Sequence, residues 1–167
     1  MRALLSLLLV SSCSLAVGDD PSGYDVAPDA APDAPSRVEL IVNEVAPGGS
    51  PDDWFEVYNG TSQNISLKDY SYSDSPDRPP VTFGGSVILE PGAYHVEFLT
   101  DDYPGFGLSS EESIRLYRGQ SLIDEMVWLE SDGIEDGALA RYPDVIGDPT
   151  VTTNPTPGFP NQANTGN

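Results

Sequence analysis

The sequence predicts an all-β domain, a sandwich or barrel of about eight short strands. Three observations support this prediction. The chain has 16 Gly and 16 Pro, which punctuate it at short intervals. The segments between them are rich in β-branched and aromatic residues, and helical periodicity is nearly absent. Short strands separated by turn signals at close spacing are typical of β-sandwiches and barrels.

Period-two alternation assigns faces to several of these segments. In residues 94–99, Tyr94, Val96 and Phe98 form the predicted core face, opposite a polar face that includes His95. In residues 122–129, we expect Ile123, Val127 and Leu129 to share one side, and in residues 113–117 Ile114 and Leu116 share one. The predicted strands are residues 38–45, 54–59, 65–72, 80–83, 87–89, 94–99, 113–117 and 122–129.

The N-terminus has the layout of an export signal. Arg2 is followed by the apolar residues 3–10, which are too few to span a bilayer as a helix. The run ends in Val10-Ser11-Ser12-Cys13, which resembles the lipobox of bacterial lipoproteins. The resemblance implies that residues 1–12 are a signal peptide and that Cys13 carries a lipid anchor. A rival cut at residues 16–18 would release a secreted soluble protein instead.

Cys13 is the only cysteine of the chain. An odd cysteine in an exported protein is reactive, intermolecular or modified, and lipidation accounts for it. Residues 13–36 follow, with five Asp, several Pro and no Lys or Arg. Proline and like charges favour an extended chain, so we expect a disordered acidic tether here rather than a Pro-motif ligand. From the resemblance to bacterial lipoproteins we expect the protein to be exported and membrane-anchored in the cell envelope of a bacterium.

Residues 37–161 are enough for one domain, and residues 162–167 form a polar tail. The domain carries 22 acidic and six basic residues, a net charge of −16, and the whole chain nets −20. Such a field repels nucleic-acid phosphates, so we expect no nucleic-acid partner. It suits cations, basic partners or a solvated exterior.

An ordered set of short segments across residues 37–161 resembles the lamin-tail domain. The acid-Trp pair that leads into residues 53–59 is the most recognisable of them. Val145 follows a Pro-Asp pair at a position where the family often has Gly, and the Trp often found soon after is lacking. The matching segments are residues 38–45 (VELIVNEV), 53–59 (DWFEVYN), 65–70 (ISLKDY), 89–94 (LEPGAY), 106–109 (FGLS), 114–117 (IRLY), 140–144 (ARYPD) and 156–161 (TPGFPN).

The resemblance implies an immunoglobulin-like β-sandwich. In bacteria such modules are appended to exported and surface proteins. A nuclear lamin role does not carry over to an anchored, acidic form. We therefore expect a noncatalytic, lipid-anchored envelope module that binds an unknown protein or envelope partner.

Motifs for catalysis are sparse in the domain. His95 is the only histidine, no Gly-x-Ser-x-Gly elbow is present, and no His/Cys spacing suits zinc. A histidine on the solvent-facing side of a strand is the interpretation that we favour. We expect no enzyme activity. A metal-dependent or carboxylate-based hydrolase remains the alternative.

Paired carboxylates leave calcium open as a second alternative, in a calcium-binding adhesion module. Calcium takes several oxygen ligands from flexible loops. The best local candidates are Asp132, Glu135 and Asp136, although their spacing differs from that of an EF-hand loop. No cofactor is otherwise expected.

Glu44, Glu56 and Arg141 lie within the family-like segments. Glu56 alternates with Phe55 and Val57, so it shares a face with Trp54. An unpaired buried carboxylate is costly, and Arg141 could supply a partner. We expect the three residues to form a structural polar cluster rather than a hydrolase site.

Overall fold

The computed structural model describes residues 39–134 and 136–164. This part of the chain contains eleven strands and two 3₁₀ turns and no α-helix, which confirms the all-β prediction. No helix in it is long and apolar enough to cross a membrane. The strands are β1 (Leu40–Ala46), β2 (Asp53–Asn59), β3 (Ile65–Ser66), β4 (Tyr70–Ser73), β5 (Val81–Thr82), β6 (Ile88–Leu89), β7 (Tyr94–Leu99), β8 (Glu112–Arg118), β9 (Ser121–Trp128), β10 (Ala138–Tyr142) and β11 (Asp148–Thr152).

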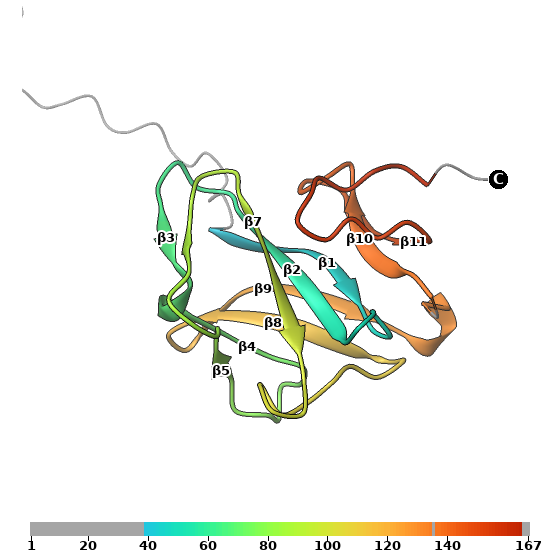
Figure 1. Cartoon of the computed structure of the whole chain (residues 1–167), viewed down its shortest axis with the longest axis horizontal. Coiled ribbons are helices and arrows are strands. Elements are labelled where there is room, and N and C mark those ends of the chain that lie inside the picture. The colour runs from blue at the N-terminus through green and yellow to red at the C-terminus, as the bar shows by residue number, and fades with distance from the viewer. Residues whose placement is uncertain (1–38, 135, 165–167) are drawn as a thin grey trace, which may run out of the picture. The chain divides into compact units, whose positions relative to one another are not determined.

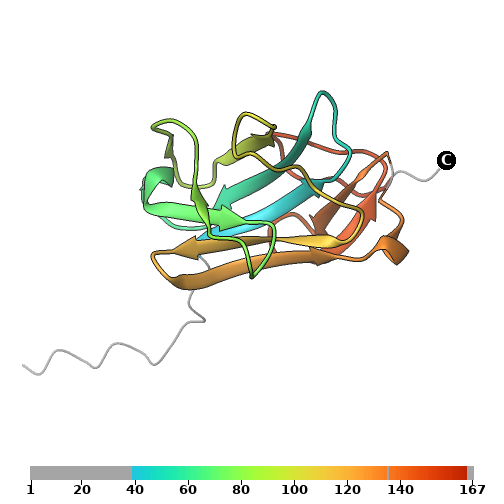
Figure 2. The same ribbon diagram turned by 90° about the horizontal axis from the view of Figure 1, so that it is seen from below.

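The strands form a sandwich with two main layers (Figure 1). One layer is a five-stranded sheet in the order β11-β10-β1-β2-β7, and the other is a four-stranded sheet in the order β5-β4-β8-β9. The short strands β3 and β6 form a separate pair. Figure 2 shows the layers from the side, with β8 and β9 forming the lower edge. All pairs of neighbouring strands are antiparallel, as expected for a chain with short connections.

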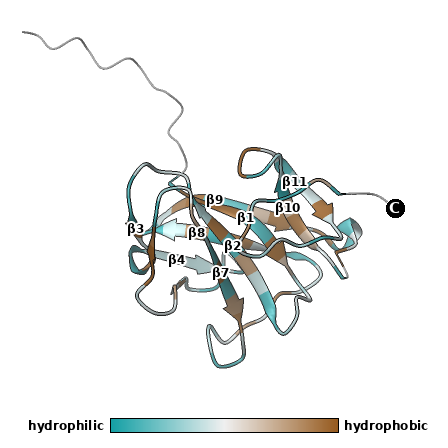
Figure 3. Ribbon diagram, turned by 45° about the horizontal axis from the view of Figure 1, so that its top comes forward, coloured by the Kyte–Doolittle hydropathy of each residue, from teal (hydrophilic) through white to brown (hydrophobic). Residues whose placement is uncertain are grey.

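The core lies between the two layers. Phe55 of β2 packs edge-on against Tyr72 of β4, with ring centroids 4.8 Å apart. Leu116 and Trp128 close the core from the second sheet, where they are 0% and 1% exposed. Full burial of each large apolar side chain stabilises the fold by roughly 1.5–3 kcal/mol. Hydrophobic and hydrophilic residues both occur along the strands of each layer (Figure 3), and the inner faces of the two sheets enclose the main core.

A β-bulge at Asn43 interrupts β1. Val42 pairs with Val57, while Glu44 pairs with Glu56, so one extra residue is inserted in β1. A bulge of this kind re-aims the side chains that follow it. As a result Val42 and Val45 both face the core, and Glu44 is turned to the opposite face of the sheet.

The predicted strand over residues 65–72 is divided in the structure. A 3₁₀ turn at Leu67–Asp69 separates β3 from β4. Leu67 is fully buried there and its N–H donates to Val87 O, so the chain turns inward between two sheets. β10 and β11 were not predicted from periodicity, and they bring the strand count above the eight expected.

The predicted faces of β7 are inverted. His95 and Glu97 pair with Val57 and Phe55, which point into the core. The Glu97 carboxylate is buried and accepts hydrogen bonds from the Tyr72 hydroxyl and the Gly84 N–H, both through Oε1. Because these donors satisfy the carboxyl group, a polar side chain is tolerated on the inner face.

The predicted grouping of Ile123, Val127 and Leu129 on one side of β9 is wrong. Ile123 packs against the core, and a register shift beside it places Val127 and Leu129 on the outer side. Met126 and Trp128 are the buried side chains, whereas Val127 is 55% exposed and Leu129 is 51% exposed. The larger side chains occupy the core, and the Trp128 indole N–H donates to Ser109 O at 2.9 Å. Burial of an indole requires such a partner for its N–H.

Candidate functional site

A cluster of buried polar side chains lies on the outer face of the five-stranded sheet. Its centre is the pair Glu44 and Glu56, which oppose each other across β1 and β2. Both side chains are 0% exposed. They are covered by the C-terminal segment, residues 153–161, which runs beside β10 and β11 (red in Figure 1). We call these residues and their hydrogen-bond partners the carboxylate cluster.

Glu44 holds the start of the C-terminal segment. The backbone N–H of Thr156 donates to both carboxylate oxygens, at 3.2 and 3.0 Å. The Thr156 hydroxyl lies 3.2 Å from Glu44 Oε2 and 2.9 Å from Asn161 Oδ1. Thr156 therefore connects β1 to the end of the segment that covers it.

Glu56 holds the next turn of the segment. The Gly158 N–H donates to Glu56 Oε2 at 2.6 Å, and the Asn43 side-chain amide donates to Oε1 at 3.0 Å. Gly158 has a φ of +83°, a left-handed conformation that glycine adopts without steric cost. This conformation directs its N–H at the carboxylate.

Asp144 is a third carboxylate in the cluster. Its Oδ1 accepts hydrogen bonds from the Asn43 amide at 3.0 Å and from the Asn161 N–H at 2.9 Å. Its Oδ2 accepts a hydrogen bond from the Tyr94 hydroxyl at 2.5 Å. Desolvation and the bond to Asp144 raise the pKa of Tyr94.

Asn161 connects the C-terminal segment to both β1 and β10 through hydrogen bonds. Its side-chain amide donates to Asn43 O and to Arg141 O, each at 3.0 Å. The side chain is 6% exposed. Buried carbonyls at a bulge need such donors, so Asn161 completes the hydrogen bonding of β1 and β10.

Burial controls the protonation of the two glutamates. Desolvation raises the pKa of Glu44 to about 7, and the hydrogen bonds from Thr156 oppose this rise. Desolvation also raises the pKa of Glu56 to about 8, against the hydrogen bonds from Asn43 and Gly158. The nearby negative charge of Asp144 raises both values further.

Arg141 does not pair with either glutamate, contrary to our expectation. Its Nη2 lies 3.2 Å from both carboxylate oxygens of Asp124, and its Nε donates to Val42 O at 2.8 Å. Ala140 is the register partner of Glu44, and successive residues of a strand point to opposite faces. Arg141 is therefore directed toward β9, away from the carboxylate cluster.

His95 is directed into the sandwich, not to solvent as predicted. Its Nε2 lies 3.0 Å from Glu97 Oε2, and its side chain is 20% exposed. Glu97 also accepts a hydrogen bond from the Tyr72 hydroxyl. Burial, together with the nearby Glu97 carboxylate, raises the pKa of Tyr72. Within the described residues the imidazole is hydrogen-bonded to a carboxylate and not to a hydroxyl group that could act as a nucleophile.

The two described calcium candidates, Asp132 and Asp136, have different surroundings in the structure. Asp132 Oδ2 accepts the Leu129 N–H at 2.8 Å, which is the role of a cap on the 3₁₀ turn Glu130–Asp132. Asp136 lines a cavity of about 400 Å³ beside Trp54 and Pro155. Glu135 and the predicted lipidation site Cys13 lie outside the described residues. Within 39–134 and 136–164, no three His, Cys, Asp or Glu side chains are grouped to hold a metal ion.

Sequence reasoning found Glu44 and Glu56 but missed the residues that cover them. Asn43, Asp144, Thr156 and Asn161 all belong to the carboxylate cluster. One signal was present, because the polar pair Asn43 and Glu44 interrupts an otherwise apolar run in residues 40–46. The contact between Glu44 and Thr156 spans 112 positions of sequence, and local patterning carries no information about it.

Comparison with protein families identifies a domain in this chain. The profile of the Lamin Tail Domain family matches residues 33–130. The matched range contains β1 to β9 and ends before β10 and β11. No curated protein matches the chain.

Proposed function

The chain belongs to the lamin tail domain family, and from this premise we propose that it is a noncatalytic module of the bacterial cell envelope. In this proposal a lipid on Cys13 anchors the chain to a membrane. The folded domain, carried on the tether of residues 13–36, binds a protein or another envelope component.

The noncatalytic part of the proposal is supported by the family, which is not an enzyme family. The carboxylate cluster carries the argument further. Glu44 and Glu56 receive backbone N–H donors from Thr156 and Gly158, and both are fully buried. A general acid or nucleophile must reach its substrate, and the C-terminal segment covers both carboxylates.

Anchoring is supported by the sequence. The apolar run of residues 3–10 is followed by a lipobox-like ending at Cys13. Attachment through more than one acyl chain would hold the protein stably at a membrane, where a single chain would not. The acidic charge of the domain favours a position away from an anionic surface, which the tether would provide.

Metabolic labelling tests the anchor. A labelled fatty acid should be incorporated into the wild-type protein and not into Cys13→Ser. The control is Ser14→Ala, which leaves the cysteine in place and should be labelled like the wild type. Equal labelling of wild type and Cys13→Ser would rule out the lipid anchor.

Crosslinking tests the binding role. The full-length protein, crosslinked in its own envelope and purified, should bring down a defined partner. The same partner should be recovered at reduced yield from Cys13→Ser, because release from the membrane lowers the local concentration. A protein recovered alone from both strains would contradict the binding role.

A further inference from the structure

The edge strand β7 has an unpaired side. Among the described residues, β7 is hydrogen-bonded only to β2 and ends the five-stranded sheet. The Asn59 N–H donates to Ala93 O at 3.0 Å, which sets the alternation of the antiparallel ladder. The backbone groups of Tyr94, Val96 and Phe98 then point away from β2. Such a row of free N–H and C=O groups can pair with another strand.

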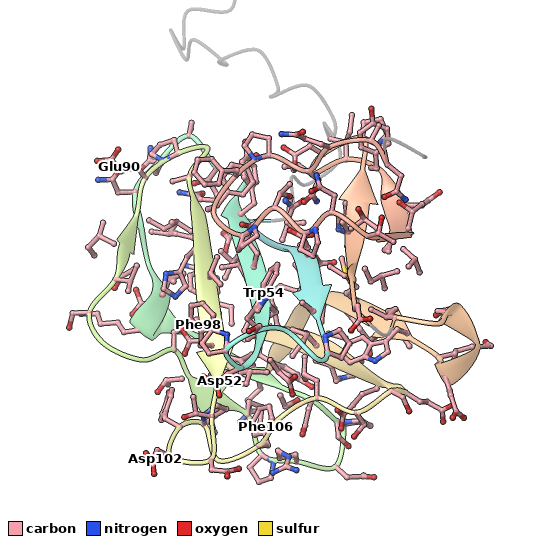
Figure 4. All side chains as sticks on the ribbon, turned by 45° about the vertical axis from the view of Figure 1, so that its right-hand side comes forward. Asp52, Trp54, Glu90, Phe98, Asp102 and Phe106 are labelled. Carbon is pink, nitrogen blue, oxygen red and sulfur yellow. The ribbon has the colours of Figure 1, made fainter. Side chains whose placement is uncertain are left out.

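The outer face of this edge is apolar, which follows from the inverted faces of β7. Phe98 is 46% exposed and pairs in register with Trp54 of β2. Figure 4 shows Phe98 on β7 next to its register partner Trp54. Tyr94 and Val96, which lie on the same face, are partly buried. A solvent-exposed aromatic residue on an unpaired edge offers a contact for an added strand.

An acidic groove lies where β7 ends. It has a volume of about 310 Å³ and is lined by Asp52, Asp53, Thr100 and Asp101, among others. Both carboxylate oxygens of Asp53 already have hydrogen-bond donors within the domain, namely the Gly48 N–H at 2.7 Å and the Leu108 N–H at 2.6 Å. Asp52 and Asp101 are exposed. The lining contains no Lys or Arg, so the groove presents negative charge beside the apolar edge.

We propose that the β7 edge, meaning β7 with Phe98 and the groove at Asp52 and Asp101, docks an extended segment of a partner protein. The segment adds a strand to the five-stranded sheet. An apolar side chain of the segment packs on Phe98, and a Lys or Arg enters the acidic groove. This inference rests on the proposed binding function and gives it a surface and a partner chemistry.

Charge decides between a basic partner and a second copy of this chain. Residues 37–161 carry a net charge of −16, so two copies that met through their β7 edges would repel each other. A segment with Lys or Arg is attracted by the same field. The opposite edge strand of the second sheet, β9, is less available, because Asp124 of β9 is engaged by the Val42 N–H and by Arg141.

The test uses labelled synthetic peptides and the full-length protein. Two peptides of about nine residues alternate Val and Thr and carry two Lys at one end or at the other, because the direction of the added strand is open. Matched peptides carry Glu in place of Lys, and a third set is N-methylated at alternate backbone positions. Fluorescence anisotropy should show saturable binding of one Lys peptide. The Glu and N-methylated peptides should bind at least about tenfold more weakly.

Variants of the protein locate the site. Phe98→Lys should weaken binding about tenfold or more, whereas Ile88→Lys, at a residue that is 58% exposed elsewhere, should not. Neutralising the groove with Asp52→Asn and Asp101→Asn together should weaken binding and reduce its dependence on salt. The matched control neutralises Asp69 and Asp77, which are also exposed. Thermal melts check that each variant folds, and the N-methylated peptides test the edge on wild-type protein.

Several outcomes overturn the inference. They are the absence of binding by both Lys peptides, equal binding by the N-methylated peptides, and equal binding by Phe98→Lys and Ile88→Lys. A dimer of the wild type that is lost in Phe98→Lys would show that a second copy occupies the edge. If the envelope partner is still crosslinked to Phe98→Lys at wild-type yield, the assignment of the binding site to the β7 edge is wrong, whereas the proposed binding function is still supported. If no partner is crosslinked to the wild type, the binding role itself fails.

Discussion

Glu44 and Glu56 face each other across β1 and β2, fully buried and without a basic partner among the described residues that contact them. Their oxygens are satisfied instead by the N–H groups of Thr156 and Gly158 and the amide of Asn43. Two like charges in one buried site are costly, so the pair favours protonated forms. The stability of this domain should therefore depend on pH in a direction opposite to that of ordinary ion-paired carboxylates.

The unfolding free energy should fall as pH rises from about 4.5 to about 8. The folded-state pKa values of Glu44 and Glu56 are raised to about 7 and about 8, so the folded form binds more protons than the unfolded form in this window. The stabilisation is fully present below pH 4.5, where both states are protonated. Denaturant melts at pH 5, 6, 7 and 8 measure the slope. A stability that rises over this range would contradict the raised pKa values.

Glu44→Gln should flatten this pH dependence. Glutamine keeps an acceptor for the Thr156 N–H and does not titrate. Glu130→Gln is the matched control, because Glu130 is exposed on a 3₁₀ turn. The control should retain the wild-type slope. Identical slopes for both variants would remove Glu44 as a source of the effect.

Asn161→Ala should destabilise the domain by about 2 kcal/mol, because it leaves the buried Asn43 and Arg141 carbonyls without their donor. It should also increase hydrogen exchange at the Thr156 and Gly158 amides. Gln162→Ala, at the exposed neighbouring position, is the control and should change neither quantity. Unchanged exchange in Asn161→Ala would show that the segment is held by other contacts.

Trp54→Ala should destabilise the domain by about 3 kcal/mol. Trp54 is 4% exposed, but it packs with Ala46 and Ala138 outside the main core, on the outer face of the sheet. We therefore place the cost near the low end for a large aromatic side chain. Phe159→Ala, at a residue that is 69% exposed, should cost far less. Urea titration compares the two, and equal costs would contradict the burial of Trp54.

Val145→Asn should stabilise the domain by about 1 kcal/mol. Val145 has a φ of +67°, a left-handed conformation that is strained for a β-branched residue and acceptable for Asn. Its N–H donates to Asn43 Oδ1 at 3.0 Å, which holds it there. Ile146→Asn, at the 85% exposed neighbour, should have little effect on the melting temperature. A lower melting temperature for Val145→Asn would show that its side-chain packing outweighs the strain.

Calcium and magnesium should be indistinguishable in a thermal melt at matched ionic strength. Asp132 already caps a 3₁₀ turn, and both ions then act only by screening a highly acidic chain. A calcium site would select against magnesium, which needs a tighter octahedral shell. A calcium-specific rise in melting temperature that is lost on Asp132→Asn with Asp136→Asn would establish a site.

The positions of most strands could be predicted from sequence, but the faces of two could not. β-branched content and turn residues located β2, β7 and β8 to within about two residues. Alternation separates the two faces of a strand without stating which is buried. In β7 the more apolar face, with Phe98, lies outside, because pairing with β2 places Glu97 beside the core residue Phe55.

The candidate site was predictable only in part. Glu56 was placed with Trp54 on one face by strand alternation, and the register confirms this. The pairing of Arg141 with Asp124, and the cover supplied by Thr156, depend on contacts between distant parts of the chain. Such contacts follow from the packing of sheets and loops, which local sequence patterns do not encode.

The C-terminal segment also determines where the C-terminal boundary of this domain should be placed when it is produced alone or fused to another protein. The family match ends at residue 130, whereas the hydrogen bonds that complete β1 and β2 come from Thr156, Gly158 and Asn161. A fragment cut at the end of the match would expose two carboxylates and the bulge to water and would leave a sheet edge open. The hydrogen bonds of the domain continue beyond Asn161 to Asn164, which bonds to Val151 and Thr152, so the family match underestimates the length of the domain at this end.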